Sequence, residues 1–250
     1  MNSPRISVTS ESFPCPEGAA VRDHPAVRCD PHSAESQDWP QFLSGVSLFD
    51  NAVRLRFFLW TLRRHVSPGA HLLEVGFGSG TTAVLLADLG YRVTACDLNS
   101  QLVARVAGKY KDWIDSKQLC VQQADMFQLP WADQTFDLAY HQGVFEHFPD
   151  ERILAALREQ ARVARLVAFD VPNHRYGAHP FGDERLLKID HWRKLIEKAR
   201  LELLDERGRD FHHWLYCLPH ALFSHRALDR MPWFVRRFAV SSIFVCRGKA

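Results

Sequence analysis

Three glycines fall within five positions directly after an apolar run, in the stretch Leu-Leu-Glu-Val-Gly-Phe-Gly-Ser-Gly-Thr-Thr at residues 72–82. Glycine is costly inside a strand or a helix, so this cluster indicates a tight turn whose backbone approaches another group closely. The residues before the turn predict a strand over 71–75, and those after it predict a helix over 81–89. A strand, a glycine turn and a helix in this order favour an α/β fold.

Strand and helix patterns continue to alternate along the chain. The predicted strands cover residues 71–75, 91–97, 119–123, 136–141, 166–171, 201–206 and 239–246, and the predicted helices cover 81–89, 100–110, 149–164 and 192–199. Such alternation is typical of parallel strands with helices on both faces of the sheet. We therefore expect an α/β fold with a doubly wound, mostly parallel sheet of seven strands.

The first part of the chain differs from the rest in composition. Residues 1–38 are rich in Pro, Ser, Asp and Glu and show no periodicity, which predicts a mostly disordered arm. Residues 39–250 are predicted to form a single domain. Within it, residues 39–66 have a helical pattern and are expected to form a cap helix. The helical spacing of that cap is carried by Val53, Phe57, Trp60 and Arg64.

A second departure precedes the last strand. Residues 211–238 are aromatic and basic, and we expect a helical insert over 207–238. An aromatic lid that excludes water from an apolar pocket is the favoured interpretation. A dimer contact or plain packing, a membrane-surface helix, and a contact for an acidic partner remain alternatives.

Composition limits the class of protein. The net charge of +2 gives no reason to expect a nucleic-acid partner, and no apolar stretch is long enough to span a bilayer. The N-terminal residues lack the apolar segment of a secretory signal. Cys96, Cys120 and Cys246 lie in strand-like runs, where cysteine usually behaves as a small hydrophobe. These features predict reduced thiols, a cytoplasmic location and no stable membrane association.

Two cysteines and two histidines in the N-terminal arm are candidate metal ligands. Their spacings match no common zinc pattern, so we expect no metal site. The four residues are Cys15, His24, Cys29 and His32.

The glycine turn and an aspartate after the next strand indicate which class of ligand the protein binds. In an open α/β sheet, ligands lie at the carboxyl ends of the strands, where strand order reverses. The amides of Gly76, Gly78 and Gly80 and the helix N-terminus after them can hold an anion. About 20 residues further on, the second strand ends in Asp97, a carboxylate placed to accept the hydroxyls of a ribose. The pattern therefore predicts a nucleoside with an anionic extension.

Two other nucleotide-binding patterns fit less well. A nicotinamide dinucleotide site requires G-x-G-x-x-G or alanine at the last position, and Thr81 stands there when counting starts at Gly76. A P-loop fails because no Gly-Lys-Ser/Thr follows the glycines.

Residues 72–150 resemble the class I S-adenosylmethionine-dependent methyltransferases, close to the small-molecule "type 11" branch. The family opens with an acidic residue followed by G-x-G-x-G, and residues 74–80 (Glu-Val-Gly-Phe-Gly-Ser-Gly) fit at every position. Residues 123–126 (Gln-Ala-Asp-Met), 129–138 and 141–150 look like the family's next three elements, in its order. The resemblance implies a Rossmann-like methyltransferase fold and S-adenosylmethionine as cofactor. The cofactor-binding residues that it implies are Glu74, Gly76, Gly78, Gly80, Asp97, Leu98, Asp125, Met126 and His141.

Methyl transfer from a sulfonium mainly requires alignment of a nucleophile with the methyl carbon. A base is needed only when the acceptor holds its proton at neutral pH, as an alcohol does. Candidates follow the fourth and fifth strands, and the case in which no base is used stays open. The histidines proposed as catalytic are His141, His147 and His174, with Tyr176 and His179 in the same loop as His174.

The expected function is transfer of a methyl group, by in-line displacement, to an O, N or C atom of a small organic molecule. Residues 140–143 replace the Asn/Asp-Pro-Pro-Tyr/Phe segment that marks methylation of DNA amino groups and certain protein glutamines in the family. No Pro-Cys nucleophile for cytosine C5 follows the fourth strand either. A methyltransferase for RNA or protein, and a non-catalytic cofactor-binding protein, remain alternatives. A homodimer is left open.

Overall fold

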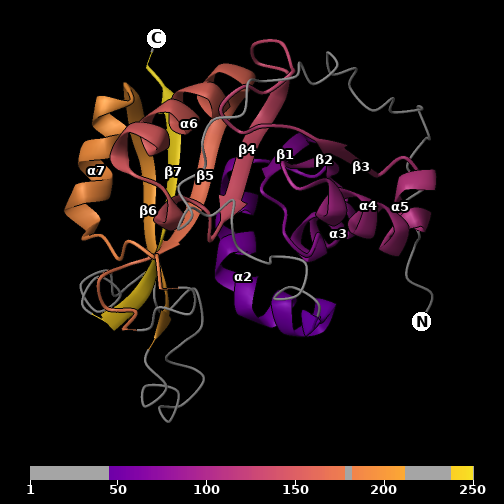
Figure 1. Ribbon diagram of the computed structural model, residues 1–250, viewed down its shortest axis with the longest axis horizontal. Coiled ribbons are helices and arrows are strands. Elements are labelled where there is room, and N and C mark those ends of the chain that lie inside the picture. The colour runs from indigo at the N-terminus through magenta and orange to yellow at the C-terminus, as the bar shows by residue number, and fades with distance from the viewer. Residues whose placement is uncertain (1–44, 178–181, 212–237, 250) are drawn as a thin grey trace.

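The computed structural model describes residues 45–177, 182–211 and 238–249. These residues form a seven-stranded sheet with strand order β3-β2-β1-β4-β5-β7-β6, flanked by helices (Figure 1). The predicted doubly wound, mostly parallel α/β sheet is confirmed. The strands are β1 (His71–Val75), β2 (Arg92–Asp97), β3 (Leu119–Gln123), β4 (Phe136–Gln142), β5 (Ala164–Pro172), β6 (Leu201–Phe211) and β7 (Ala239–Gly248).

Strand order reverses beside β1. β1 pairs in parallel with β2 on one side and with β4 on the other, so its carboxyl end faces a gap between two diverging crossovers. β7 is antiparallel to both of its neighbours, β5 and β6. The antiparallel strand therefore lies far from β1, and the reversal point is built entirely from parallel strands.

Helices cover both faces of the sheet. They are α2 (Leu48–His65), α3 (Thr81–Asp88), α4 (Ser100–Lys109), α5 (Lys111–Asp115), α6 (Asp150–Val163) and α7 (Ile189–Lys198), with a short 3₁₀ turn η3 (Phe145–His147) after β4. Leu72 of β1 packs with residues of α2, α3 and α4. Its neighbour Leu73 belongs to a separate core cluster on the other face, because side chains alternate along a strand. Phe169 of β5 joins α6 and α7 in the third cluster.

The cap helix α2 has a different buried face from the one predicted. Val53 is 48% exposed, while Leu55, Phe58 and Leu62 are fully buried. The predicted face is wrong at Val53 because polar Asn51 takes the buried position instead. Of the residues predicted for this face, Phe57 is buried and Trp60 is partly exposed, with the guanidinium of Arg64 5.0 Å from the centroid of the Trp60 ring.

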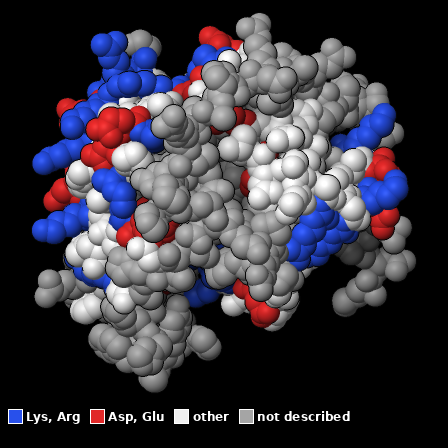
Figure 2. Space-filling model, viewed as in Figure 1, with Lys and Arg blue, Asp and Glu red and all other residues white. Residues whose placement is uncertain are grey.

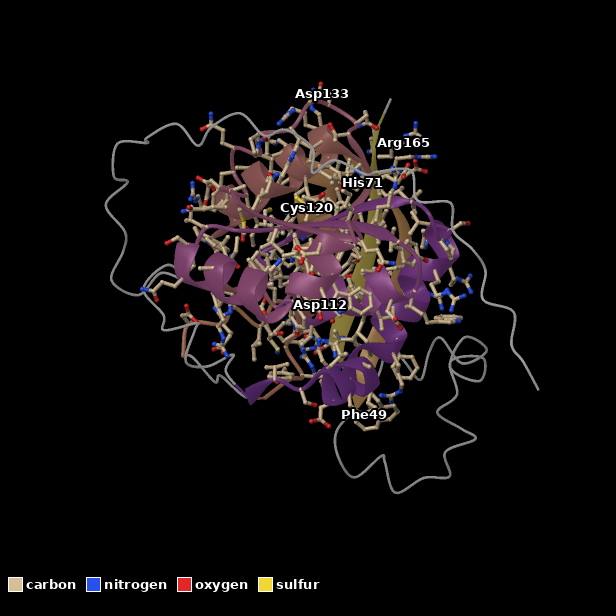
Figure 3. The ribbon with its side chains drawn as sticks, turned by 90° about the vertical axis from the view of Figure 1, so that its right-hand side faces the viewer. Phe49, His71, Asp112, Cys120, Asp133 and Arg165 are labelled. Carbon is tan, nitrogen blue, oxygen red and sulfur yellow. The ribbon has the colours of Figure 1, made fainter. Side chains whose placement is uncertain are left out.

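Asn51 anchors α2 beside the glycine turn. Its Nδ2 donates to Thr81 Oγ1 at 2.5 Å and to Thr82 Oγ1 at 3.3 Å, at the start of α3. Phe49, in the first turn of α2, is 76% exposed and lies at the end of the molecule opposite Asp133 and Arg165 (Figure 3). The first turns of α2 are thereby fixed at the carboxyl end of the sheet.

The predicted helical insert is wrong over its first residues. Residues 207–211 continue β6, because Arg207, Gly208 and Arg209 pair with β7 in antiparallel register. The rest of the insert, from residue 212 to 237, lies outside the described residues, as do the predicted arm at 1–38 with its cysteines and histidines and the start of the cap helix.

The cysteine prediction needs a correction. Cys96 and Cys246 are free and buried, as expected for small core residues. Cys120 of β3, however, is disulfide-bonded, so the prediction of reduced thiols is wrong at that position. Among the described residues, no helix has the length and apolar character needed to cross a membrane.

Candidate active site

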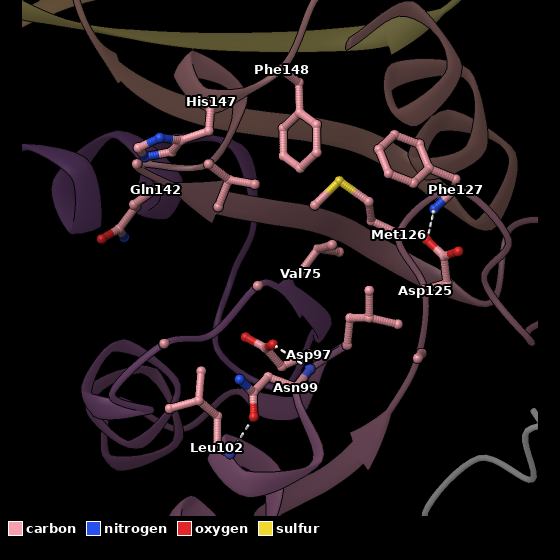
Figure 4. Close-up of a pocket in the computed structure, with 16 residues that line it drawn as sticks. Val75, Asp97, Asn99, Leu102, Asp125, Met126, Phe127, Gln142, His147 and Phe148 are labelled. Atoms are coloured by element: carbon pink, nitrogen blue, oxygen red, sulfur yellow. Dashed lines mark hydrogen bonds between the residues drawn. The ribbon is translucent and has the colours of Figure 1, made fainter. Parts of the chain in front are cut away.

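A cavity of about 370 Å³ opens at the carboxyl ends of β1, β2 and β4, at the reversal of strand order (Figure 4). In the view of Figure 4, Asp97 and Asn99 lie on one side of the cavity and His147 and Gln142 on the other. The lining residues are Val75, Gly76, Gly78, Asp97, Leu98, Asn99, Leu102, Ala124, Asp125, Met126, Phe127, Gln142, Gly143, Val144, His147 and Phe148.

The glycine turn brings bare backbone to this cavity. Gly76, Gly78 and Gly80 all have positive φ angles, which residues with a side chain rarely adopt. The Gly76 amide donates to Cys96 O at 2.8 Å and so ties the turn to β2. A Cβ atom on Gly76 would lie 3.1 Å from Cγ2 of Val144, which also lines the cavity. Glycine at this position therefore lets the turn pack closely against Val144.

Glu74 supports the turn from behind. It is buried, and its Oε2 accepts a hydrogen bond from the Tyr140 hydroxyl at 3.1 Å. Its carboxyl also accepts the backbone N–H of Ala83 in α3. Burial raises the pKa of Glu74 to about 8. Glu74 is not one of the described residues that line the cavity. Its hydrogen bonds instead connect β1 with β4 and α3 around the turn.

Asp97 lines the cavity with a fixed carboxylate. Its Oδ1 accepts the Asn99 N–H at 2.9 Å, and the backbone amides of Gly78 and Leu98 also donate to it. Burial raises the pKa of Asp97, although these hydrogen bonds oppose the shift. The side chain is thus held against the glycine turn, at the position predicted for a ribose acceptor. Leu98, predicted beside it, also lines the cavity and is 47% exposed.

The far wall combines an aspartate with apolar and aromatic side chains. Asp125 Oδ1 accepts the Phe127 N–H at 2.9 Å, and Met126 lies between these two residues in the sequence. The Phe127 and Phe148 rings meet edge to face, with centroids 5.5 Å apart. The Arg152 guanidinium lies 3.4 Å from the Phe127 ring centroid and fixes that ring from outside. Asp125 and Met126 were predicted here, whereas Phe127 and Phe148 were not.

His147 is the predicted histidine that reaches the cavity. Its side chain is 3% exposed, and its Nδ1 lies 2.9 Å from Asp183 Oδ1. The two residues are 36 positions apart, and Asp183 comes from the loop after β5. The fold therefore builds a histidine–aspartate pair at the rim of the cavity, and Asp183 was missed in the sequence.

His141 lies elsewhere. It is fully buried in the core, with its ring centroid 3.9 Å from that of Phe145 and 5.7 Å from that of Phe169. Neither ring nitrogen has a hydrogen-bond partner within the described part of the chain. Burial lowers the pKa of His141 to about 3. The side chain is not part of the cavity wall, so the structure does not favour the predicted roles of this imidazole in catalysis or cofactor binding.

Replacing His141 with leucine is expected to leave cofactor binding unchanged and to make the protein less sensitive to acid. The unfolded chain binds a proton near pH 6.5, but the folded protein does so only near pH 3, so stability is lost as pH falls below 6.5. This residue should cost the wild type roughly 2 kcal/mol between pH 7 and pH 5. Denaturant unfolding of both proteins at the two pH values measures the difference. Equal losses in both would contradict the burial of His141.

The remaining predicted bases do not reach this cavity. His174 and Tyr176 are exposed, and neither is part of the cavity wall. Burial and the charges of Arg175 and Lys188 lower the pKa of His174. His179 lies outside the described residues. Of the three histidines proposed as catalytic, only His147 is brought to the cavity.

Part of the chain is similar to known proteins. The family model described as a methyltransferase domain matches residues 73–166. An O-methyltransferase of Pyrenophora dematioidea is 36% identical over 104 residues, 41% of this chain and 38% of that protein. O-methyltransferase resE of Aspergillus sclerotiorum is 34% identical over 100 residues, 40% of this chain and 37% of that protein. The chain thus spans less than two fifths of the length of these two relatives.

The fold is shared with solved structures. Magnesium protoporphyrin IX methyltransferase (ChlM) from Synechocystis PCC 6803, solved with bound SAH, superimposes with a TM-score of 0.59 at 17% identity. The superposition covers 88% of this chain and 97% of that one.

Proposed function

We propose that this chain is a class I S-adenosylmethionine-dependent methyltransferase that transfers a methyl group to a hydroxyl oxygen of a small organic molecule. The observation that carries the choice of a hydroxyl acceptor is the His147–Asp183 pair at the rim of the cavity. The names of two relatives, both O-methyltransferases, agree with this choice.

The cavity fits the cofactor of this family. The Gly76 and Gly78 backbone lines the cavity on the side where the methionine portion would lie, and Asp97 presents a fixed acceptor for ribose hydroxyls. Leu98, Met126 and Phe127 offer apolar surface for an adenine ring. When bound there, S-adenosylmethionine would supply a methyl group on a sulfonium, whose displacement releases a neutral thioether as a good leaving group.

His147 is the proposed base. An alcohol or phenol acceptor keeps its proton near neutral pH, so the oxygen gains from a base that removes the proton during attack. The Asp183 carboxylate can only accept a hydrogen bond, so Nδ1 of His147 carries the hydrogen and Nε2 is the basic nitrogen. Asp183 also stabilises the imidazolium that forms. The proton thus moves from the acceptor oxygen to Nε2 of His147 as the oxygen bonds to the methyl carbon, while the S–CH3 bond of the bound cofactor would break and S-adenosylhomocysteine would be released.

Isotope transfer tests the proposal. The protein is incubated with methyl-labelled S-adenosylmethionine and matched acceptors that carry either a phenol or an aliphatic hydroxyl or an amine on the same scaffold. Methylated hydroxy compounds identified by mass spectrometry would support the proposal. Methylated amines only, or label found only in added RNA or protein, would contradict it. Figure 2 shows basic and acidic side chains side by side on its left.

Replacing Asp97 with alanine should weaken S-adenosylmethionine binding. The variant loses a charged acceptor in a largely buried position, which costs roughly 1–3 kcal/mol, or about a 5- to 150-fold increase in Kd. Asp112→Ala, which removes an exposed carboxylate from α5, is the matched control. Titration calorimetry measures both variants. Equal affinities in wild type and Asp97→Ala would mean that the ribose lies elsewhere.

The cytoplasmic location and the absence of a nucleic-acid partner stay predictions that follow from composition. The homodimer stays open. The same labelling assay on fractionated substrates addresses the nucleic-acid partner.

A further inference from the structure

In the segment after β5, one arginine, Arg185, contacts the backbone on both sides of His147. We propose that Arg185 is a positioning residue that holds Asp183 against His147, an inference that rests on the proposed role of His147 as the base. Asp183 and Arg185 are two positions apart in the loop between β5 and α7, and both contact the residues that follow β4.

Arg185 donates hydrogen bonds to the backbone on both sides of His147. Its backbone N–H donates to Glu146 O at 2.8 Å, immediately before the histidine. Its Nη1 donates to Phe148 O at 2.6 Å, immediately after it. Its Nη2 donates to Asp150 Oδ1 at 2.7 Å, in the first turn of α6. Three hydrogen bonds therefore fix the loop relative to the backbone that carries His147.

The carboxylate of Asp150, which accepts the third hydrogen bond, is held by a second side chain. His191 Nε2 lies 2.9 Å from Asp150 Oδ2, so the two carboxylate oxygens of Asp150 face one side chain each. The Arg185 and Asp150 side chains are 32% and 28% exposed, which shields the pair partly from water. A planar guanidinium can reach a carbonyl and a carboxylate at once, and a lysine ammonium in the same place is a single point charge.

Asp183 is placed by this loop. On its N-terminal side, Gly182 has a φ of +83°, a conformation open mainly to glycine. The Gly182 N–H donates to Glu184 Oε2 at 3.0 Å, which is a contact within the loop. Arg185 connects the same stretch to the walls of the cavity, because Phe148 and His147 both line it. Loss of the guanidinium should therefore let Asp183 move away from the imidazole.

Kinetics on a double-mutant cycle test this inference. Arg185→Ala should lower kcat roughly 10- to 100-fold, the size expected for a misplaced catalytic group, with cofactor Kd little changed. In an Asp183→Asn background, Arg185→Ala should cause no further loss, because both substitutions break the same pairing. Losses that multiply in the double variant would overturn the inference. Arg193→Ala, which removes an arginine of α7 that pairs with Glu206 of β6, is the control and should keep wild-type kcat.

A second readout does not depend on activity. ¹⁵N NMR of the His147 ring in the wild type should show the Nδ1–H tautomer, and Arg185→Ala should show a mixture with the Nε2–H form. An unchanged tautomer in Arg185→Ala would overturn the inference. A changed tautomer in a protein that methylates no hydroxyl compound would support the inference while rejecting the proposed function. If Arg185→Ala does not fold, Arg185→Lys is measured in the same two ways and should show the same direction of change.

Discussion

Replacing His147 with alanine is expected to reduce kcat for a hydroxyl acceptor by about 10²- to 10⁴-fold, the range measured for loss of a general base. Of the three histidines predicted to be catalytic, His147 is the one that lines the cavity. Its ring is oriented by Asp183, whose Oδ1 lies 2.9 Å from His147 Nδ1. The Kd of the cofactor should change little, because Asp97 and the glycine turn are the groups proposed to bind the ribose and the methionine portion of the cofactor. Steady-state kinetics with saturating cofactor, together with calorimetry, separate the two effects.

His65 offers a matched control for this variant. It pairs with a carboxylate in the same manner, since its Nε2 lies 3.1 Å from Asp205 Oδ2, but it is not part of the cavity wall. His65→Ala should therefore keep wild-type kcat. A His147→Ala enzyme with undiminished kcat would show that the acceptor needs no base, as a tertiary amine would not.

Replacing Gly80 with alanine is expected to destabilise the protein by about 2–5 kcal/mol. Gly80 precedes α3 with a φ of +70°, where a non-glycine residue costs roughly 1–2 kcal/mol. A Cβ atom there would lie 2.6 Å from Cγ1 of the buried Val106, and such overpacking costs about 1–3 kcal/mol more. The melting temperature should fall by roughly 4–20 °C.

Gly108→Ala is the control for this substitution. Gly108 lies in α4, and within the described part of the chain an added Cβ would meet no atom within 4 Å beyond its chain neighbours and the backbone of its own helix. Alanine is the better helix former, so this variant should gain roughly 0.5–1 kcal/mol. Calorimetric scans of both variants test the pair of predictions. Equal melting temperatures for Gly80→Ala and wild type would mean that the turn does not have this conformation.

The sheet could be predicted because its signals are local. All seven predicted strands are present, and runs such as 71–75 before the glycines are short, mostly apolar and followed by turn residues. The end of β6 could not be predicted, because Arg207, Gly208 and Arg209 carry no strand pattern and are held there by pairing with β7. The buried face of α2 was missed for a similar reason, since Asn51 is buried through its bonds to Thr81 and Thr82.

The candidate site was predictable only in part. The glycines and Asp97 stand in an order that the sequence displays directly. His141 and His147 could not be ranked, because strand alternation and a 3₁₀ turn decide which of them reaches the cavity. Asp183 and Arg185 contact the cavity-lining residues His147 and Phe148 only after the chain has passed through β5, and no spacing in the sequence indicates these contacts.

The most direct test of the central claim is a crystal structure of the protein with S-adenosylhomocysteine. We expect its ribose hydroxyls on the Asp97 carboxylate, its amino-acid portion against the Gly76–Gly78 backbone, and its adenine beside Met126 and Phe127. A nucleoside bound at another place, or a cavity left empty at saturating ligand, would contradict the account.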